Sequence, residues 1–220
     1  SKKRLLAYAN SQLSKALDIN TLTIGFARRA ATYKRAQLIF KDVDRLIDIG
    51  KGKIQIIFSG KAHPKDEGGK SLIKNIVKSS KYFTGHIKII YLENYNMWLG
   101  RLITSGVDVW LNTPLRPNEA SGTSGMKASL NGVPNLSVLD GWWSEGCIDG
   151  VNGWAVGNPN EISDEADADH LYNLIENNVI PSYYGDKDDW STMMKESIKT
   201  GISYTSHRMV TDYNNQYYKL

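Results

Sequence analysis

The chain has 220 residues, of which 23% are charged, and its formal net charge is +4. This length is enough to bury a core, and one α/β domain over residues 1–220 is expected. A mean hydropathy of −0.40 and the lack of an apolar run near the roughly 20 residues of a bilayer span exclude an integral membrane protein. Lysines dispersed among acids exclude a nucleic-acid surface and favour anionic small molecules as partners.

Cysteine and histidine usage gives two further expectations. Cys147 is the single cysteine, so no internal disulfide is possible, and a reducing cytoplasm fits. The four histidines, His63, His86, His170 and His207, lack the spacing of metal ligands, and no metal site is expected. The first residues have the pattern of a helix and not of a signal peptide.

Strand and helix patterns alternate along the first two thirds of the chain. Predicted strands, which are nearly continuous apolar runs, cover 21–27, 53–60, 86–92, 107–111 and 134–139. Predicted helices cover 3–17 (with Leu13 on its apolar face), Thr32 or Lys34 to Gly50, 71–82, about 97–104, and 126–132. Short connections and apolar strands predict a doubly wound, Rossmann-like parallel sheet with helices on both faces.

The last third predicts loops and then helices. Residues 140–146 and 152–157 are expected to be loops, and their tryptophans either stack on a sugar or pack in the core. The acidic residues 161–169 are expected to form the solvated start of a helix. Closing helices are expected over about 187–220, and the apolar stripe that ends with Met209, Val210, Tyr213 and Tyr217 is expected to pack against the rest of the chain.

A basic turn follows the first predicted strand. Arg28, Arg29 and Lys34 lie where that strand ends and the next helix is expected to begin. The carboxyl edge of a parallel sheet is where ligands bind, and cations at a helix start oppose the helix dipole unless an anion joins them. The turn is therefore either an anion site or a solvated basic turn.

A loop rich in glycine and hydroxyl groups, residues 116–127, follows the fourth predicted strand. Gly122 and Gly125 let the backbone approach a ligand closely, and Thr123 and Ser124 add hydroxyl donors. Because the first N–H groups of a helix have no intrahelical partner, this strand–loop–helix sequence predicts an anion site.

Lys127 lies one turn into the helix that follows the loop. An amine in such a place can be desolvated beside a bound group and can form a Schiff base with an aldehyde cofactor. The alternative is a polar loop that only caps a helix, with a surface lysine after it.

Four segments resemble a known family in the same order. Residues 119–127 look like the cofactor segment of the α-glucan (glycogen, starch and maltodextrin) phosphorylases, and residues 28–35 are similar to the family's basic Lys-Arg-x-x-x-Tyr-Lys-Arg segment. Residues 60–62 and 92–95 also match. The resemblance is strong over about 20–160 and loose in the closing helices.

The resemblance implies pyridoxal 5′-phosphate as cofactor. Lys127 matches the catalytic lysine that holds it as a Schiff base. The other positions that match cofactor contacts are Gly122, Thr123 and Ser124 near the phosphate, Arg28 where a lysine is usual, and Tyr95 near the pyridine ring.

The resemblance also implies a substrate site. Arg29 and Lys34 match the catalytic cations that bind the substrate phosphate, and Glu119, Ser121 and Gly122 match positions that hold glucose hydroxyls. The implied reaction is reversible phosphorolysis of terminal α-1,4-glucosyl units of a glucan by inorganic phosphate, which releases glucose 1-phosphate.

The chain is short for such an enzyme. The resemblance implies the carboxyl-terminal half of a two-domain glycosyltransferase B-type architecture, with the amino-terminal domain absent and the isolated chain inactive. Two alternatives stay open: half of a nucleotide-sugar glucosyltransferase of the synthase type, or a non-catalytic glucan-binding module. Synthases of this architecture have two glutamates separated by seven residues. In this chain Glu119 is followed at that interval by Lys127, which favours a phosphorylase over a synthase.

Overall fold

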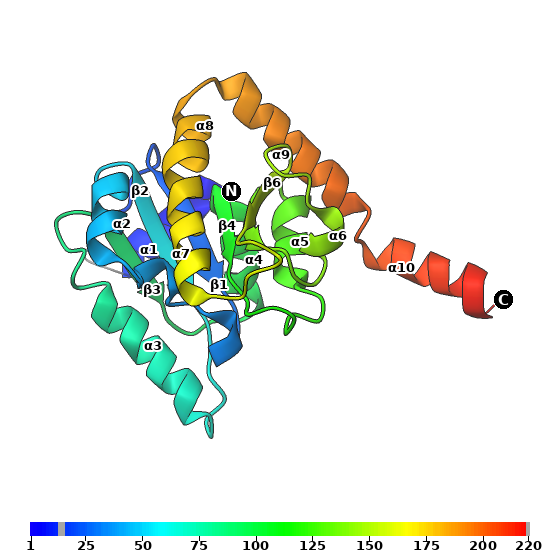
Figure 1. Cartoon of the computed structure of the whole chain (residues 1–220), viewed down its shortest axis with the longest axis horizontal. Helices are drawn as coiled ribbons and strands as arrows, with labels where there is room; N and C mark the ends of the chain where they lie inside the picture. Colours follow the sequence, from blue (N-terminus) through cyan, green and yellow to red (C-terminus); the bar gives the residue numbers. More distant parts are fainter. Residues whose placement is uncertain (13–15, 219–220) are drawn as a thin grey trace.

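The computed structural model describes residues 1–12 and 16–218. Within these residues six strands form one parallel sheet in the order β3-β2-β1-β4-β5-β6 (Figure 1). The strands are β1 (Leu22–Ala27), β2 (Ile54–Ser59), β3 (Lys88–Leu92), β4 (Val109–Asn112), β5 (Asn135–Val138) and β6 (Gly153–Val156). The predicted Rossmann-like α/β fold is confirmed, and the order reverses between β1 and β4.

Helices of different lengths connect and follow the strands. The α-helices are α1 (Lys2–Gln12), α2 (Val43–Gly50), α3 (Glu67–Ser79), α4 (Met97–Gly106), α5 (Thr123–Leu130), α6 (Trp143–Gly146), α7 (Asp164–Leu174), α8 (Ile180–Tyr184), α9 (Lys187–Ile202) and α10 (Ser206–Tyr213). Two short 3-10 turns, η1 (Thr32–Lys34) and η2 (Leu38–Phe40), and two π-helical segments, η3 (Ile175–Val179) and η4 (Asn214–Tyr218), complete the set in the described ranges. None of these helices is long and apolar enough to cross a membrane.

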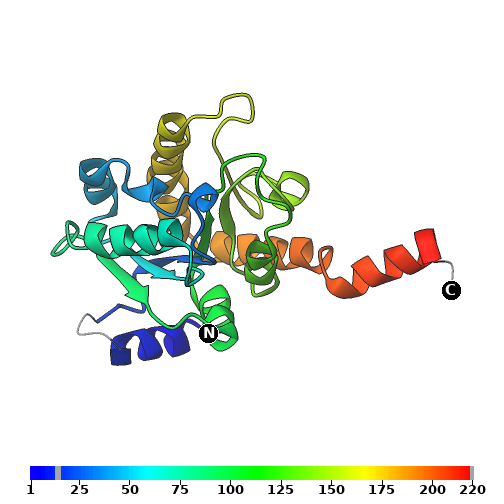
Figure 2. The same cartoon turned by 90° about the horizontal axis from the view of Figure 1, so that it is seen from below.

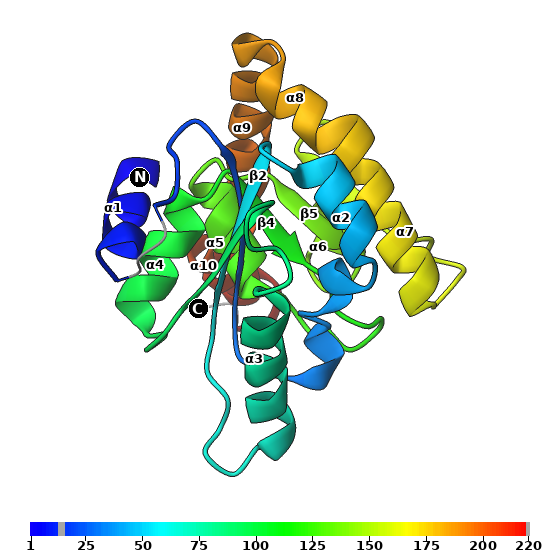
Figure 3. The same cartoon turned by 90° about the vertical axis from the view of Figure 1, so that its left-hand side faces the viewer.

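The sheet separates two apolar cores. In β2, Ile54, Ile56 and Phe58 point into the core under α2, α3 and α7, and Ile57 points into the core under α1, α4 and α5. Figure 3 shows α1 and α4 on one side of the sheet and α2 and α7 on the other. Burial on both faces explains why most strand residues are apolar. The polar residues inside the strands, such as Gln55 of β2 and Asn135 of β5, are buried and form hydrogen bonds.

The helix predicted from Thr32 or Lys34 to Gly50 is wrong, because the chain makes η1, η2 and then α2 in its place. Arg35 ends η1 in the left-handed region at φ 45°, which no helix can continue through. Helix α2 begins only where the Asp42 carboxylate accepts a hydrogen bond from the backbone N–H of Arg45 at 2.9 Å.

The predicted loop over residues 152–157 is also wrong, since it contains β6, which pairs with β5 from Asn135↔Gly153 to Val138↔Val156. The glycines in this segment give no strand pattern, and the extended conformation of β6 is instead fixed by its pairing with β5. Helix α3 begins four residues before the predicted 71–82 because the Asp66 carboxylate caps it, accepting from Gly69 N–H at 2.8 Å.

The two ends of the chain differ from their predictions. The first helix ends at Gln12 in the described range, and Leu13 lies outside the described residues. The closing stripe of Met209, Val210 and Tyr213 on α10 with Tyr217 on η4 is 46–71% exposed, so its predicted packing is wrong. Figure 2 shows α10 extending beyond the body of the molecule.

Candidate functional site

The sheet brings the basic turn and the glycine-rich loop to one edge. The turn follows β1, the loop follows β4, and β1 and β4 are neighbours. This is the point where the strand order reverses and where open α/β sheets bind ligands. The carboxyl ends of two adjacent strands therefore define the candidate site.

Backbone hydrogen bonds fix the basic turn against the end of β2. Arg28 N–H donates to the Ser59 carbonyl at 3.2 Å, and Ala30 N–H donates to the Lys61 carbonyl at 2.9 Å. Gly60 is needed between them because a Cβ at this position would overlap the Arg28 carbonyl oxygen. The turn is thus held in register with the sheet before any side chain acts.

Arg28, Lys34 and Glu119, three residues that the sequence assigned to the site, meet in the structure. Arg28 Nη2 lies 2.7 Å and Lys34 Nζ 2.5 Å from the same oxygen, Oε2 of Glu119. Arg28 Nη1 also donates to Asn112 Oδ1 at the end of β4. One carboxylate therefore joins the turn after β1 to the loop after β4.

This charge cluster is removed from water. Lys34 is 6% and Glu119 7% exposed, so the interpretation as a solvated basic turn fails for Lys34. Burial lowers the pKa of the Arg28 guanidinium, and the nearby Glu119 carboxylate acts in the opposite direction. Loss of Glu119 would leave two buried cations without compensation. The anion that the basic turn requires is supplied by Glu119. Arg29, in contrast, is exposed.

Asp140 holds the backbone of the glycine-rich loop. Its Oδ2 accepts from Glu119 N–H and its Oδ1 accepts from Gly141 N–H, both at 2.9 Å. Trp142 N–H donates to the Ser121 carbonyl at 2.9 Å. These bonds fix the backbone of Glu119, while its side chain faces Arg28 and Lys34.

The start of α5 is open to a ligand. Gly122 is the residue before the helix, with φ 82°, and no side chain of the described residues caps the first N–H groups. Gly125 faces the interior, where a Cβ would lie 2.6 Å from Asn135 Oδ1 and 2.7 Å from Trp142 Nε1. The predicted helix start after the glycine-rich loop is thus present, although the helix begins three residues before the predicted 126–132. Anion binding at this helix start stays a prediction.

The remaining predicted residues lie around this helix start. Ser121, Thr123 and Lys127 are exposed, and Ser124 is half-buried. Among the contacts of the described residues, Lys127 Nζ has no hydrogen-bond partner, so the desolvation expected of this amine is absent from the chain by itself. Tyr95 is half-buried against Gly100, and burial raises the pKa of its hydroxyl.

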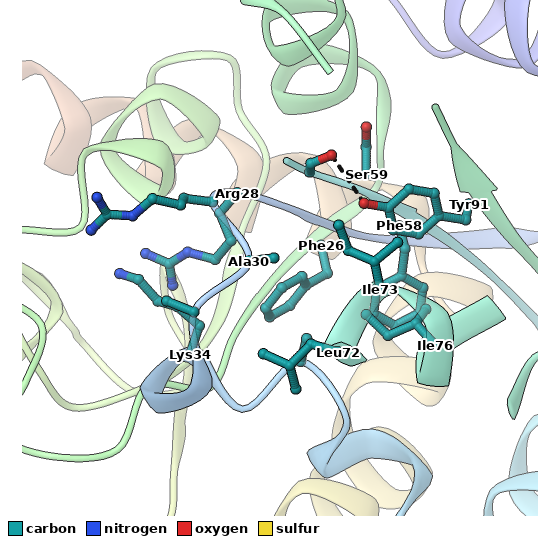
Figure 4. A pocket seen from close by; sticks show the side chains of 14 residues that line it. Phe26, Arg28, Ala30, Lys34, Phe58, Ser59, Leu72, Ile73, Ile76 and Tyr91 are labelled. Atoms are coloured by element: carbon teal, nitrogen blue, oxygen red, sulfur yellow. Dashed lines mark hydrogen bonds between the residues drawn. The ribbon is translucent and has the colours of Figure 1, made fainter. Parts of the chain in front are cut away.

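A small cavity lies under the basic turn (Figure 4). Its volume of about 20 Å³ has room for roughly one water molecule, so neither a sugar nor a cofactor fits. The Arg28 and Lys34 side chains extend away from its apolar lining of Phe26, Leu72 and Ile73 (Figure 4). The charged groups of the turn therefore face Glu119 and not this cavity.

The sequence reasoning missed a second charge cluster. Asp167 is fully buried and lies between Arg35 and Arg116, although the acidic segment 161–169 was predicted to be solvated. Both arginines belong to segments that the sequence had singled out, but Asp167 comes from α7 and has no local sequence signal. The pairing is set by tertiary packing alone.

The three tryptophans that could have stacked on a sugar belong to the core. Trp142, Trp143 and Trp154 are each at most 3% exposed, and Trp143 Nε1 donates to the Trp154 carbonyl at 3.2 Å. Their prediction as packing residues is confirmed, and sugar stacking is ruled out for them in this conformation.

Cys147 is expected to react slowly in the folded chain. Burial, with a smaller contribution from Asp149, raises the pKa of its thiol to about 12. Since the thiolate is the nucleophile, alkylation by iodoacetamide at pH 8 should be at least about tenfold slower in the native chain than in denaturant. Equal rates in the two conditions would show that the thiol is accessible and unperturbed.

The fold and the site together define a Rossmann-like α/β unit with paired cations at the reversal of its strand order. The family of carbohydrate phosphorylases matches residues 1–145, and the chain belongs to this family.

Named relatives agree with the family match. The chain is 51% identical to the maltodextrin phosphorylase of Thermococcus litoralis, over 92% of this chain and 25% of the relative. It is 49% identical to the glycogen phosphorylase of Aquifex aeolicus, over 92% of this chain and 31% of the relative. It is 43% identical to the glycogen phosphorylase of Mycobacterium tuberculosis, over 94% of this chain and 25% of the relative. The chain thus spans about a quarter to a third of the length of these relatives.

Proposed function

We propose that the chain is the cofactor- and phosphate-binding half of an α-glucan phosphorylase. In this proposal it is one α/β domain, the carboxyl-terminal half of a two-domain architecture, and works in the cytoplasm. More than two thirds of the length of these relatives lies outside the match. We propose that the substrate site is a cleft with this chain as one wall, and that an amino-terminal domain, corresponding to that unmatched length, forms the other wall. The chain alone would then turn over no glucan.

The observation that supports this proposal most directly is the ion cluster across β1 and β4. Arg28 and Lys34 share one carboxylate oxygen of Glu119 in a buried place, and Arg29 is exposed next to them. A phosphate that binds Arg29 and Lys34 adds negative charge beside Glu119. The carboxylate is then released from part of its pairing and can accept hydrogen bonds from glucose hydroxyls, together with Ser121.

The same edge fits a phosphorylated aldehyde cofactor. The open N–H groups at the start of α5 suit its phosphate, and the left-handed Gly122 brings the backbone close. Thr123 and Ser124 add hydroxyls, Arg28 adds a cation, and Lys127 offers an amine one turn further on. Pyridoxal 5′-phosphate would supply a second phosphate that exchanges a proton with, or electrostatically supports, the substrate phosphate.

The proposed reaction moves one glucosyl unit. An oxygen of inorganic phosphate bonds to C1 of the terminal sugar with retention, the bond from C1 to the glucan oxygen breaks, and that oxygen takes a proton. The products are glucose 1-phosphate and a shortened α-1,4-glucan. Two phosphates at short range repel by several kcal/mol in a closed site, and Arg28, Arg29 and Lys34 offset this repulsion.

Chemical trapping of the cofactor tests the proposal. The full chain is mixed with pyridoxal 5′-phosphate, reduced with borohydride and digested, and the modified lysine is identified by mass spectrometry. We expect preferential labelling of Lys127, loss of this label in Lys127→Arg, and an unchanged label in the control Lys195→Arg, which replaces an exposed lysine of α9. Labels spread over surface lysines would instead support a nucleotide-sugar enzyme or a non-catalytic glucan-binding module.

A further inference from the structure

Asp167 of α7 bridges two buried arginines from distant parts of the chain. Its Oδ2 lies 2.6 Å from Arg35 Nη2, and its Oδ1 lies 3.1 Å from Arg116 Nη2. Asp167 is fully buried and both arginines are 9% exposed. Arg35 Nη1 also lies 2.8 Å from Oδ1 of Asp164, the half-exposed first residue of α7. Asp167 is therefore the carboxylate that joins the end of the basic turn to the start of the glycine-rich loop.

Arg35 transmits this contact to Lys34. Arg35 directly follows Lys34, and its guanidinium donates to the carbonyl oxygens of Thr113 at 3.0 Å and Pro114 at 2.9 Å. Thr113 Oγ1 in turn donates to the Lys34 and Arg35 carbonyls at 3.2 and 3.1 Å. The basic turn and the segment after β4 are thus linked in both directions at the residue next to the site cation.

Arg116 transmits the contact to Glu119, three residues further along the loop. Besides Asp167, its Nη2 reaches the Glu161 carbonyl at 2.9 Å. Its Nε and Nη1 are buried and have no hydrogen-bond partner among the described residues. Asp167 is consequently the one carboxylate of the described residues that pairs with Arg116.

We propose that Asp167 is a positioning residue for the phosphate site, acting through Arg35 on Lys34 and through Arg116 on Glu119. This inference rests on the proposed function, because it concerns the same site. Without the negative charge the two buried guanidinium groups would repel each other. Arg35 would keep its pairing with Asp164, but Arg116 would keep no carboxylate among the described residues, and the loop that it anchors would shift relative to the turn. Lys34 and Glu119 would then lose the close approach that gives the site its charge arrangement.

Phosphate affinity measured separately from stability tests the inference. Inorganic phosphate is titrated into the full chain and into Asp167→Asn by calorimetry, at a temperature where both are folded. The matched control is Leu171→Ala, which creates a cavity one turn further along the same helix and leaves every charge of the cluster in place. We expect Asp167→Asn to raise the Kd for phosphate at least fivefold, while Leu171→Ala lowers Tm and leaves Kd unchanged.

The outcomes separate this inference from the proposed function. No phosphate binding by the unaltered chain overturns the proposed function and the inference with it. Binding that is the same in Asp167→Asn and in the unaltered chain overturns the inference alone. Should Asp167→Asn fail to fold, Arg116→Lys is measured in its place. Lysine keeps the positive charge but cannot hydrogen-bond to both Asp167 and the Glu161 carbonyl as the guanidinium does. It should raise Kd at least threefold, and an unchanged Kd would again overturn the inference.

Discussion

Replacing Gly157 with alanine should lower the free energy of unfolding by about 3 kcal/mol, because two independent penalties meet at this position. Gly157 has φ 81°, a backbone conformation that L side chains rarely adopt. A Cβ there would also overlap Asp167 Oδ1 and lie 3.1 Å from Arg116 Nη1, inside the buried charge cluster. For a chain of this size the expected fall in Tm is roughly 6–12 °C, measured by calorimetry.

Gly52→Ala is the matched control for this prediction. Gly52 has a similar φ of 72°, but its Cβ would meet no atom within 4 Å. Alanine at residue 52 should therefore cost only the backbone strain, about 1 kcal/mol. Equal losses at the two positions would mean that the charge cluster yields freely to a methyl group, contrary to its tight packing.

Replacing Lys34 with methionine should weaken the binding of inorganic phosphate by about tenfold or more. Methionine keeps much of the side-chain volume but removes the cation that lies 2.5 Å from Glu119. A hydrogen bond to a charged group contributes about 1.5–3 kcal/mol, and 1.4 kcal/mol corresponds to tenfold in affinity. Phosphate titrations of the two chains, followed by calorimetry, measure the change.

Lys41→Met controls for the loss of one positive charge. Lys41 pairs with Glu165 at the surface, and both side chains are largely exposed, so phosphate affinity should change little. If the two substitutions weaken phosphate binding equally, the effect is one of net charge, and Lys34 has no special place in the site.

The sequence predicted the parts of the fold that depend on local pattern. Five strands bury residues on both faces of the sheet and are therefore rich in apolar residues, which allowed their prediction. β6 escaped prediction because Gly153 and Trp154 give no strand pattern, and pairing with β5 decides their conformation. The break after Lys34 escaped because the left-handed Arg35 is stabilised by its contacts with the segment after β4.

The candidate site was predictable as a place but not as a set of contacts. The rule that carboxyl ends of parallel strands share an edge brought Arg28 and Glu119 together across 91 positions of sequence. That Glu119 would neutralise Arg28 and Lys34 could not be read from the sequence, since it had been assigned to sugar hydroxyls. Asp167 was hidden because one buried carboxylate among several solvated ones has the same local pattern.

The projecting helix α10 is expected to unfold locally at a lower free energy than the sheet. None of residues 206–218 is buried, so opening this segment exposes little apolar surface that was not already in water. The amide hydrogens of this segment should therefore exchange with solvent through local fraying. Those of β1 should exchange only through cooperative unfolding of the whole sheet. Far-ultraviolet ellipticity, which sums over both, would report helix loss on heating before the sheet itself gives way.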